Sequence, residues 1–166
     1  MDRTDARASG KVADLYRTHA PAAARLAFLM TGDTARAEDL VHDAFVKVIG
    51  RFGDIRDPDA FGAYLKRTVV NLANSYFRRR RLEREHLETE GRAFREEPVG
   101  ERDPVEREQL WEALKTLSPR QRAAIVLRFY EDLSEQQTAY VLGVPVGTVK
   151  SMVSRGLDAL RTKVER

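Results

Sequence analysis

The stretch from Leu133 to Arg161 (LSEQQTAYVLGVPVGTVKSMVSRGLDALR) restricts the possible folds of this chain more than any other part of the sequence. Ser134 and Gln137 have the spacing of a capping box, which satisfies the first free backbone N–H groups of a helix. Gly143 then provides a turn, and a second amphipathic segment begins near Pro145. Two short helices joined by a glycine turn predict a helix-turn-helix.

The second of these helices, predicted from about Pro145 to Lys163, has separate apolar and polar sides. Its polar outer face carries Thr148, Lys150, Ser151, Ser154 and Arg155. Gly147, near the start, lets the backbone approach a ligand closely. In a helix-turn-helix such a face enters the major groove of DNA, where side chains contact base edges and hydroxyls hold phosphates. The alternative is an ordinary helical hairpin with a solvated basic face.

A second basic surface is predicted on the helix that starts at Asp57-Pro58, since aspartate is a good N-cap and proline suits the first helical position. The helix is expected to end at about Arg81. One side carries a polar stripe with alternating spacings of four and three residues: Arg67, Asn71, Asn74, Arg78 and Arg81. The helix dipole explains one or two arginines at a C-terminus, but not a stripe that starts turns earlier. A nucleic-acid face explains the whole stripe, because arginine holds phosphates and asparagine can read a base.

The loop before this helix, residues 51–56, contains two arginines, a glycine and an aromatic residue. Arg51, Phe52 and Arg56 are candidates for receiving an unstacked base beside the basic helix. The alternative for Phe52 and Ile55 is that both side chains fold back into the protein core.

The helix predicted over 34–50 is strongly amphipathic. Its apolar residues are Ala37, Leu40, Val41, Ala44, Phe45, Val48 and Ile49. Its polar side carries Glu38, Asp39, His42, Asp43 and Lys47. Carboxylates one turn apart on an exposed helix usually form a solvated or partner-binding face, so they do not by themselves indicate catalysis.

Charge divides the chain into three segments. Residues 1–82 carry 15 basic and 10 acidic residues (net +5), residues 83–104 carry 4 and 8 (net −4), and residues 105–166 carry 10 and 8 (net +2). Two basic blocks that flank an acidic one suit a protein that binds a polyanion at two places.

The same segments describe the expected organisation. Residues 1–10 are polar and are expected to be mobile, 11–82 to form three helices, 83–104 to form a flexible acidic linker, and 105–166 to form four helices. No segment has a strand pattern of useful length. The predicted fold is therefore all-α, with two small helical domains joined by the linker.

Catalysis is not indicated anywhere in the chain. Cysteine is absent, the three histidines are scattered, and no nucleophile-elbow, zinc-protease or phosphate-loop motif occurs. We therefore expect no enzyme activity, no metal and no cofactor. The chain also lacks an apolar run long enough for a signal peptide or a membrane span. A soluble, cytoplasmic protein that does not act at a membrane is expected.

Three stretches, in order, carry a resemblance to a known family: AEDLVHDAFVKVI, FGAYLKRTVVNLANSYFRRRRL and LSEQQTAYVLGVPVGTVKS. They resemble the group IV (extracytoplasmic-function, ECF) sigma factors of bacterial RNA polymerase, which belong to the sigma-70 family. The resemblance implies a sigma-2 domain over 11–82 and a sigma-4 domain over 105–166. It also implies a transcription initiation factor that is not an enzyme.

The resemblance further implies a role for each polar surface. The acidic side of the helix at 34–50 would dock on core RNA polymerase through Glu38, Asp39, Asp43 and their neighbours. The loop at 51–57 and the helix at 58–81 would open and read the −10 promoter element. The helix at 145–161 would read the −35 element, and the acidic linker would thread through the polymerase toward the RNA exit path.

The chain departs from many such relatives at three positions: Tyr64 stands where they have tryptophan, Thr138 where they have isoleucine or valine, and Met152 where a basic residue is common. Thr138 places a hydroxyl at a predicted core position, where it could bond to a backbone carbonyl.

The resemblance implies three partners, namely core RNA polymerase, promoter DNA and, as for many relatives, an anti-sigma factor. The free chain is expected to be a monomer. Two other interpretations stay open: a stand-alone helix-turn-helix transcription regulator, which would need a dimer surface, and a helical protein-interaction module.

Overall fold

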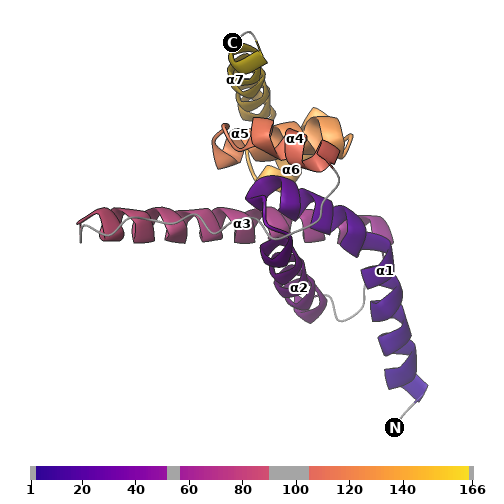
Figure 1. The fold of residues 1–166 in the computed structure, drawn as a ribbon. Coiled ribbons are helices and arrows are strands. Elements are labelled where there is room, and N and C mark those ends of the chain that lie inside the picture. Colours follow the sequence, from indigo (N-terminus) through magenta and orange to yellow (C-terminus); the bar gives the residue numbers. More distant parts are fainter. Residues whose placement is uncertain (1–2, 52–56, 90–104, 165–166) are drawn as a thin grey trace.

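The computed structural model describes residues 3–51, 57–89 and 105–164, and every regular element in these ranges is helical. An N-terminal bundle consists of α1 (Arg3–Thr31), α2 (Thr34–Arg51) and α3 (Pro58–Thr89). A C-terminal bundle (Figure 1) consists of α4 (Val105–Leu114), α5 (Pro119–Ile125), the π-helix η1 (Val126–Tyr130), α6 (Glu135–Leu142) and α7 (Val146–Val164). The predicted all-α fold with two small helical domains is confirmed.

Two predicted helix boundaries are wrong, and in both cases the helix is longer than predicted. α1 begins at Arg3, whereas the sequence pattern predicts a helix from Lys11 with a mobile segment before it. α3 continues past the predicted end at Arg81 to Thr89, and its last turns reach away from the rest of the molecule (Figure 1). Residues 83–89 therefore belong to α3, and the remainder of the predicted linker lies outside the described residues.

The extensions have a common physical cause. Both segments lack an apolar stripe, but neither contains proline, and the segment after Arg81 is rich in residues that favour a helix. In α3 the Arg81 Nε atom lies 4.0 Å from Glu85 Oε1, one turn further on. An apolar stripe shows where a helix packs against a core, and the helix itself can continue beyond that point.

The capping box predicted at Ser134 is confirmed, and Ser118 forms a second box with the same spacing. The Ser118 and Ser134 hydroxyls accept hydrogen bonds from the backbone N–H groups of Gln121 (3.3 Å) and Gln137 (3.0 Å), and each glutamine side chain accepts one from the serine N–H in return. Gly143, with φ of +66°, ends α6 in the left-handed conformation that glycine adopts without strain. These ends fix the lengths of α5 and α6.

The N-terminal bundle is held by an apolar core between its three helices. The largest side chains that are fully buried there are Leu26, Met30, Phe61, Leu65 and Val69. The rings of Phe45 and Phe61 meet edge to face with centroids 5.5 Å apart. The predicted apolar side of α2 faces this core, and its six residues from Ala37 to Val48 are buried.

The C-terminal bundle has its own core, formed by Leu117, Ala123, Val126, Leu127, Val141 and Val149. The sequence pattern also predicts Tyr130 in this core, but its side chain is 49% exposed. The cause is η1, where the Glu131 N–H bonds to the Val126 carbonyl five residues back. This wider turn rotates the following residues out of the 3.6-residue period.

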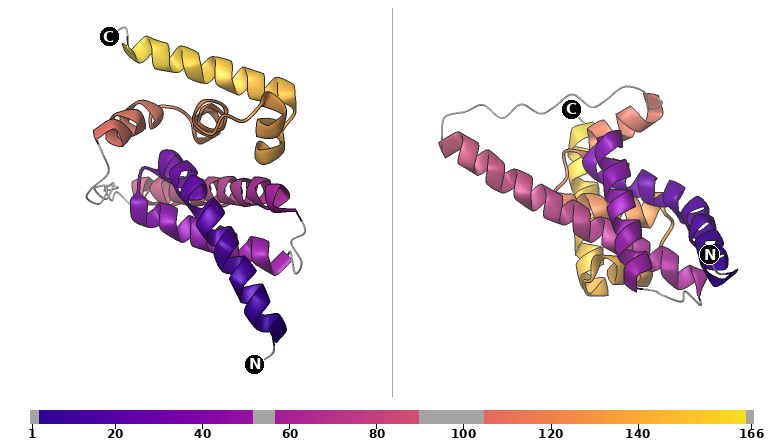
Figure 2. Two further views of the ribbon diagram at one scale, coloured as in Figure 1. Left: turned by 90° about the vertical axis from the view of Figure 1, so that its right-hand side faces the viewer. Right: turned by 90° about the horizontal axis from the view of Figure 1, so that it is seen from below.

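The two bundles pack against each other, and their apolar side chains form one continuous core. α6 lies on α3, while α4 and α5 contact α1. Seen from the side, the C-terminal bundle forms a layer above the N-terminal bundle (Figure 2). The sequence leaves this arrangement open, because the pattern of one helix does not say which faces of two domains meet.

Candidate nucleic-acid interface

The helices α6 and α7 form the predicted helix-turn-helix. The Val144 N–H donates to the Ala139 carbonyl (3.1 Å), so the chain reverses tightly around Gly143. Val149 is fully buried and anchors the inner side of α7. The opposite side of α7 must therefore face outward.

The outer face of α7 brings the predicted residues together. Lys150, Ser151, Ser154 and Arg155 are exposed, and Thr148 is half-buried. A Cβ built on Gly147 would meet no atom within 4 Å, so the backbone is open there. The Ser151 hydroxyl donates to the Gly147 carbonyl (3.1 Å), and Lys150 Nζ lies 3.6 Å from Glu135 Oε2. The face is accessible, and its contact with DNA stays a prediction.

The polar stripe on α3 is only partly accessible. Asn71, Arg78 and Arg81 are exposed and Asn74 is half-buried, so the second half of the stripe can meet a nucleic acid. Arg67, at its start, is half-buried under the helix-turn-helix. Its guanidinium carbon lies 5.4 Å from the centroid of the Tyr140 ring.

The helix-turn-helix also covers Arg67 from a second direction. The Arg67 Nη2 atom is 3.5 Å from the position that a Cβ on Gly143 would take. The turn of the helix-turn-helix therefore lies directly on this arginine. A stripe defined by helical spacing is thus divided by the fold into a covered end and an open end.

The candidate base-binding loop falls largely outside the described residues, namely Phe52, Ile55 and Arg56. Arg51, at the end of α2, is exposed. Neither of the two alternatives for Phe52 and Ile55 is tested.

The acidic side of α2 is fully accessible. Its exposed residues are Glu38, Asp39, His42, Asp43 and Lys47, as predicted for that side of the helix. Val46 is 59% exposed on the same helix. An exposed apolar side chain close to charged ones suits a protein-binding face, because water is easily displaced from it.

Sequence reasoning missed Arg122, the most constrained charged residue of the described chain. Its side chain is 5% exposed and donates to the carbonyls of Leu114 (3.1 Å), Leu117 (3.1 Å) and Met30. The first two acceptors belong to its own bundle, and the third lies at the end of α1. One signal was present: Arg122 precedes Val126 by four residues, on the buried side of the helix.

The Arg122 guanidinium is also held by aromatic rings from both bundles. Its central carbon is 4.8 Å from the Trp111 ring centroid and 5.5 Å from that of Phe77. Burial lowers the pKa of Arg122 from its ordinary value to about 10. This value is well above neutral pH, so the side chain remains charged and can donate all three hydrogen bonds.

Other contacts join the two bundles near the stripe. Lys66 Nζ lies 3.4 Å from Glu131 Oε2, and the side chains are 21% and 7% exposed. The Tyr64 and Tyr140 rings meet edge to face with centroids 6.2 Å apart. The Trp111 ring occupies the space where a Cβ on Gly32 would stand, so glycine is required there for packing as well as for its φ of +69°.

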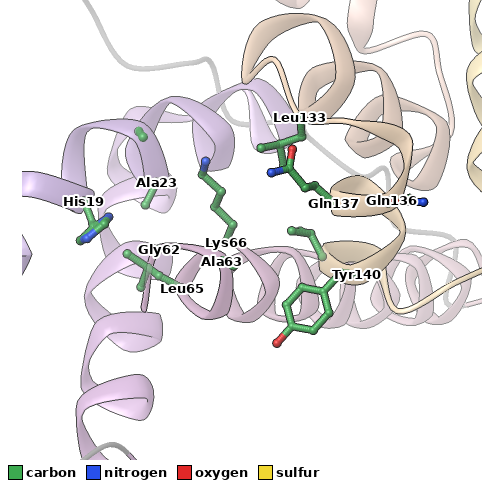
Figure 3. Close-up of a pocket in the computed structure, with 12 residues that line it drawn as sticks. His19, Ala23, Gly62, Ala63, Leu65, Lys66, Leu133, Gln136, Gln137 and Tyr140 are labelled. Atoms are coloured by element: carbon green, nitrogen blue, oxygen red, sulfur yellow. The ribbon is translucent and has the colours of Figure 1, made fainter. Parts of the chain in front are cut away.

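A cavity of about 640 Å³ lies between the bundles near these contacts. Leu133, Gln136, Gln137 and Tyr140 line it from the C-terminal bundle, opposite His19, Ala23 and Lys66 of the N-terminal bundle (Figure 3). Most of the other lining residues are small or apolar, so the cavity offers no constellation for catalysis.

The described ranges hold neither a metal site nor a membrane span. Residues 3–51, 57–89 and 105–164 contain no group of three or more histidines and carboxylates able to hold a metal ion. No helix in these ranges has the length and apolar character needed to cross a membrane.

Two family models match the chain in separate regions. The model described as Sigma-70 region 2 matches residues 15–83, and the one described as Sigma-70, region 4 matches residues 107–160. The first region contains the α3 stripe and the acidic side of α2. The second contains the helix-turn-helix.

Relatives match over most of the chain. The RNA polymerase sigma-E factor of Streptomyces avermitilis is 36% identical over 152 residues, which cover 92% of this chain and 84% of that protein. The ECF RNA polymerase sigma factor SigE of Mycolicibacterium smegmatis is 37% identical over 153 residues, covering 89% of this chain and 59% of that protein.

Solved structures agree with this assignment. The sigma factor RpoE of Bartonella quintana, solved with the anti-sigma factor NepR, has a TM-score of 0.69 and 28% identity, covering 91% of this chain and 96% of that one. CnrH, solved with the cytosolic domain of CnrY, has a TM-score of 0.68 and 26% identity, covering 95% and 92%. A stand-alone helix-turn-helix regulator would have no reason to match region 2 as well as region 4. The chain belongs to the sigma-70 family of RNA polymerase sigma factors, in its extracytoplasmic-function group.

Proposed function

We propose that this chain is a transcription initiation factor that binds bacterial core RNA polymerase and directs it to promoters. The observation that carries the proposal is the presence of two separate DNA-facing surfaces in the two family regions: the open end of the α3 stripe and the outer face of α7. A protein that recognises two distant promoter elements needs both surfaces. The acidic side of α2 provides a third surface, for the polymerase itself.

The α3 stripe, with the loop before it, recognises and opens the −10 element. Asn71, Arg78 and Arg81 are exposed in a row along the helix, so arginines can hold the phosphates while asparagine reads a base. Unstacking costs a few kcal/mol per base, which these contacts must offset together with the polymerase. Each phosphate neutralised changes the slope of log K against log[salt] by roughly −0.9.

The outer face of α7 reads the −35 element in the major groove. Lys150 and Arg155 supply charge, Ser151 and Ser154 supply hydroxyls, and Gly147 permits close backbone approach at the start of the helix. This surface is small for a protein that binds DNA alone. Core polymerase provides the missing affinity by holding both domains at the promoter, which raises the effective concentration of the second contact once the first has formed.

The acidic side of α2 docks on core polymerase through Glu38, Asp39, His42, Asp43 and Lys47. Reversing the charge of Asp39 and Asp43 to lysine weakens core binding in a pull-down, because both carboxylates are exposed on one turn of the helix. Asp14→Lys with Glu112→Lys is the matched control, since it makes the same charge change at exposed positions outside this face.

The chain is not an enzyme, and it acts in the cytoplasm, where the polymerase and chromosomal DNA are found. An anti-sigma factor holds it inactive until it is needed. The structural neighbour RpoE was solved with the anti-sigma factor NepR, which supports this part of the proposal.

Run-off transcription with bacterial core polymerase on a pool of genomic promoter fragments tests the function. We expect defined transcripts that require the added chain, with shared sequences about 10 and 35 base pairs upstream of their starts. Sequence-specific DNA binding by the chain alone, with no transcript from any fragment, would contradict the proposal.

A further inference from the structure

The four consecutive arginines from Arg78 to Arg81 do not share one side of α3. Successive residues of an α-helix are about 100° apart, so Arg80 lies roughly 200° from Arg78 and faces the opposite side. Arg78 and Arg81 belong to the open end of the α3 stripe, and both are exposed. Arg80 shares its side with Tyr76, one turn earlier, and both are half-buried. The α3 stripe therefore does not account for Arg80.

Tyr76 holds two guanidinium groups that come from different helices. The central guanidinium carbon of Arg36, on α2, is 4.7 Å from the centroid of the Tyr76 ring, and that of Arg80 is 5.6 Å from it. Arg80 Nη1 also donates to the Tyr76 hydroxyl (2.6 Å). A guanidinium that stacks on a ring uses its flat face, so the N–H groups at its edge remain able to bind an oxygen. The ring thus holds two positive groups close together where α2 meets α3.

The Arg36 side chain is not satisfied within the described ranges. It is half-buried, and its Nε atom is covered but has no hydrogen-bond partner among the described residues. Such a donor on a charged group is costly, and it is rare in folded proteins. The backbone at the same position is satisfied, because the Arg36 N–H donates to Asp33 Oδ1 (3.0 Å) at the start of α2. The guanidinium of Arg36 is therefore suited to bind an anion that another molecule supplies.

The surroundings of Arg36 favour a carboxylate of a protein over a phosphate of DNA. Arg36 begins a row along one edge of α2 that continues, at spacings of three, four and four residues, through Asp39, Asp43 and Lys47. Asp39 and Asp43 are exposed and repel DNA phosphates. A protein surface that carries both signs of charge is complementary to this row, because each charge then meets its opposite. The row belongs to the side of α2 that the proposed function places on core polymerase.

We propose that Arg36 and Arg80 bind a carboxylate of core RNA polymerase, so that the docking surface of α2 continues onto the side of α3 opposite the α3 stripe. The inference rests on the proposed function. Arginine binds a carboxylate through two parallel N–H···O bonds, which fix direction as well as adding affinity. The run of arginines then serves two partners: Arg78 and Arg81 hold promoter DNA, while Arg80 holds the polymerase. One helix thereby positions the −10 element relative to the polymerase.

Arg80→Glu and Arg78→Glu make the matched comparison, because they change the same residue type two positions apart on opposite sides of α3. Core binding is measured without DNA, by the fluorescence anisotropy of the labelled chain titrated with bacterial core polymerase. We expect Arg80→Glu to weaken core binding roughly threefold to tenfold, since it places a carboxylate against that of the polymerase. Arg78→Glu should leave core affinity unchanged.

Promoter opening should show the reverse order. Permanganate footprinting of the −10 region is done at saturating core polymerase, so that weaker docking does not limit the signal. Arg78→Glu should then reduce opening, whereas Arg80→Glu should open the promoter as the wild type does. Arg36→Glu should resemble Arg80→Glu in both measurements. Arg7→Glu, at an exposed position on α1, is the control that should change neither.

Three results would overturn the inference. The first is a folded Arg80→Glu variant with the core affinity of the wild type. The second is an equal loss of core affinity in Arg78→Glu, which would show a general effect of charge. The third is a loss of opening in Arg80→Glu at unchanged core affinity, which would assign this arginine to DNA.

Circular dichroism and urea unfolding establish that each variant is folded. Arg36 packs on Tyr76, so if Arg36→Glu does not fold, the comparison of Arg80→Glu with Arg78→Glu still decides the inference. If the wild-type chain itself does not bind core polymerase, the proposed function fails and the inference fails with it. If the wild type binds and Arg80→Glu binds equally well, the inference alone fails.

Discussion

The two DNA-facing surfaces predicted from the sequence have different surroundings in the folded chain. The outer face of α7 is open along its length, whereas the α3 stripe is open at Arg78 and Arg81 and covered at Arg67 by the helix-turn-helix. Both surfaces come from the same kind of pattern, polar residues at helical spacing. Such a pattern identifies the side of a helix that avoids the core of its own bundle. It does not say whether a second domain lies on that side.

The largest effect is expected at the contact between the two bundles, where Arg122 of α5 is buried while Arg120, two residues earlier, is exposed. Arg122→Ala should lower the free energy of unfolding by about 3 kcal/mol, because it removes a buried charge with three carbonyl acceptors and two aromatic contacts. Arg120→Ala, at an exposed position two residues earlier, should change it by no more than about 0.5 kcal/mol. Urea unfolding followed by circular dichroism measures both; equal effects would show that burial of Arg122 contributes little.

The next effect compares the open and covered ends of the stripe. Arg78→Ala with Arg81→Ala should reduce promoter opening by roughly 10- to 100-fold while core binding is unchanged, since each arginine can neutralise a phosphate. The slope of log K against log[salt] should become shallower by roughly 2. Permanganate footprinting of the −10 region and a core pull-down provide the two measurements. An equal loss of core binding would place these arginines on the polymerase instead of on DNA.

The two glycines of α7 allow a further comparison between an open and a covered position. A Cβ on Gly156 would lie 2.5 Å from Ile125 Cδ1, the terminal methyl of that side chain, so Gly156→Ala requires Ile125 to shift and should raise stability less than the same change at an open position. Gly147 has open space, so Gly147→Ala should add about 0.5–1 kcal/mol through reduced backbone entropy. If Gly147 contacts DNA as predicted, this more stable variant should nevertheless transcribe less. Stability and transcript rising together would remove Gly147 from the DNA-binding surface.

Local signals in the sequence predict the elements and their polar faces well. The capping box at Ser134 and the apolar side of α2 are as predicted, because each depends on residues within a few positions of one another. Contacts between distant residues are not predictable in this way. Arg122 bonds to a carbonyl 92 positions away, and the capping box of Ser118 and Gln121, which ends one residue before it, gives no hint of this. Arg67 fits its stripe perfectly in spacing, yet a separate domain covers it.

The exposure of Tyr130 differs from the predicted burial for another reason. Its spacing from Val126 and Leu127 is helical, but the π-helix changes the number of residues per turn inside that helix. Nothing in the apolar pattern marks this change. Periodicity therefore predicts burial only while the hydrogen-bond pattern of the helix stays constant.

An effect as small as that of Gly147→Ala is expected at Thr138, a polar residue in a fully covered position. Its side chain is 0% exposed, but the hydroxyl makes no hydrogen bond within the described part of the chain, contrary to the predicted bond to a backbone carbonyl. Thr138→Val replaces this hydroxyl by a methyl group of similar size and should add about 1 kcal/mol to the free energy of unfolding. Thr162→Val is the matched control, because Thr162 is exposed and its hydroxyl already donates to the Asp158 carbonyl (2.9 Å). A gain in urea unfolding at Thr138 alone would show that the cost arises from burial without a partner; equal changes would assign it to helix propensity.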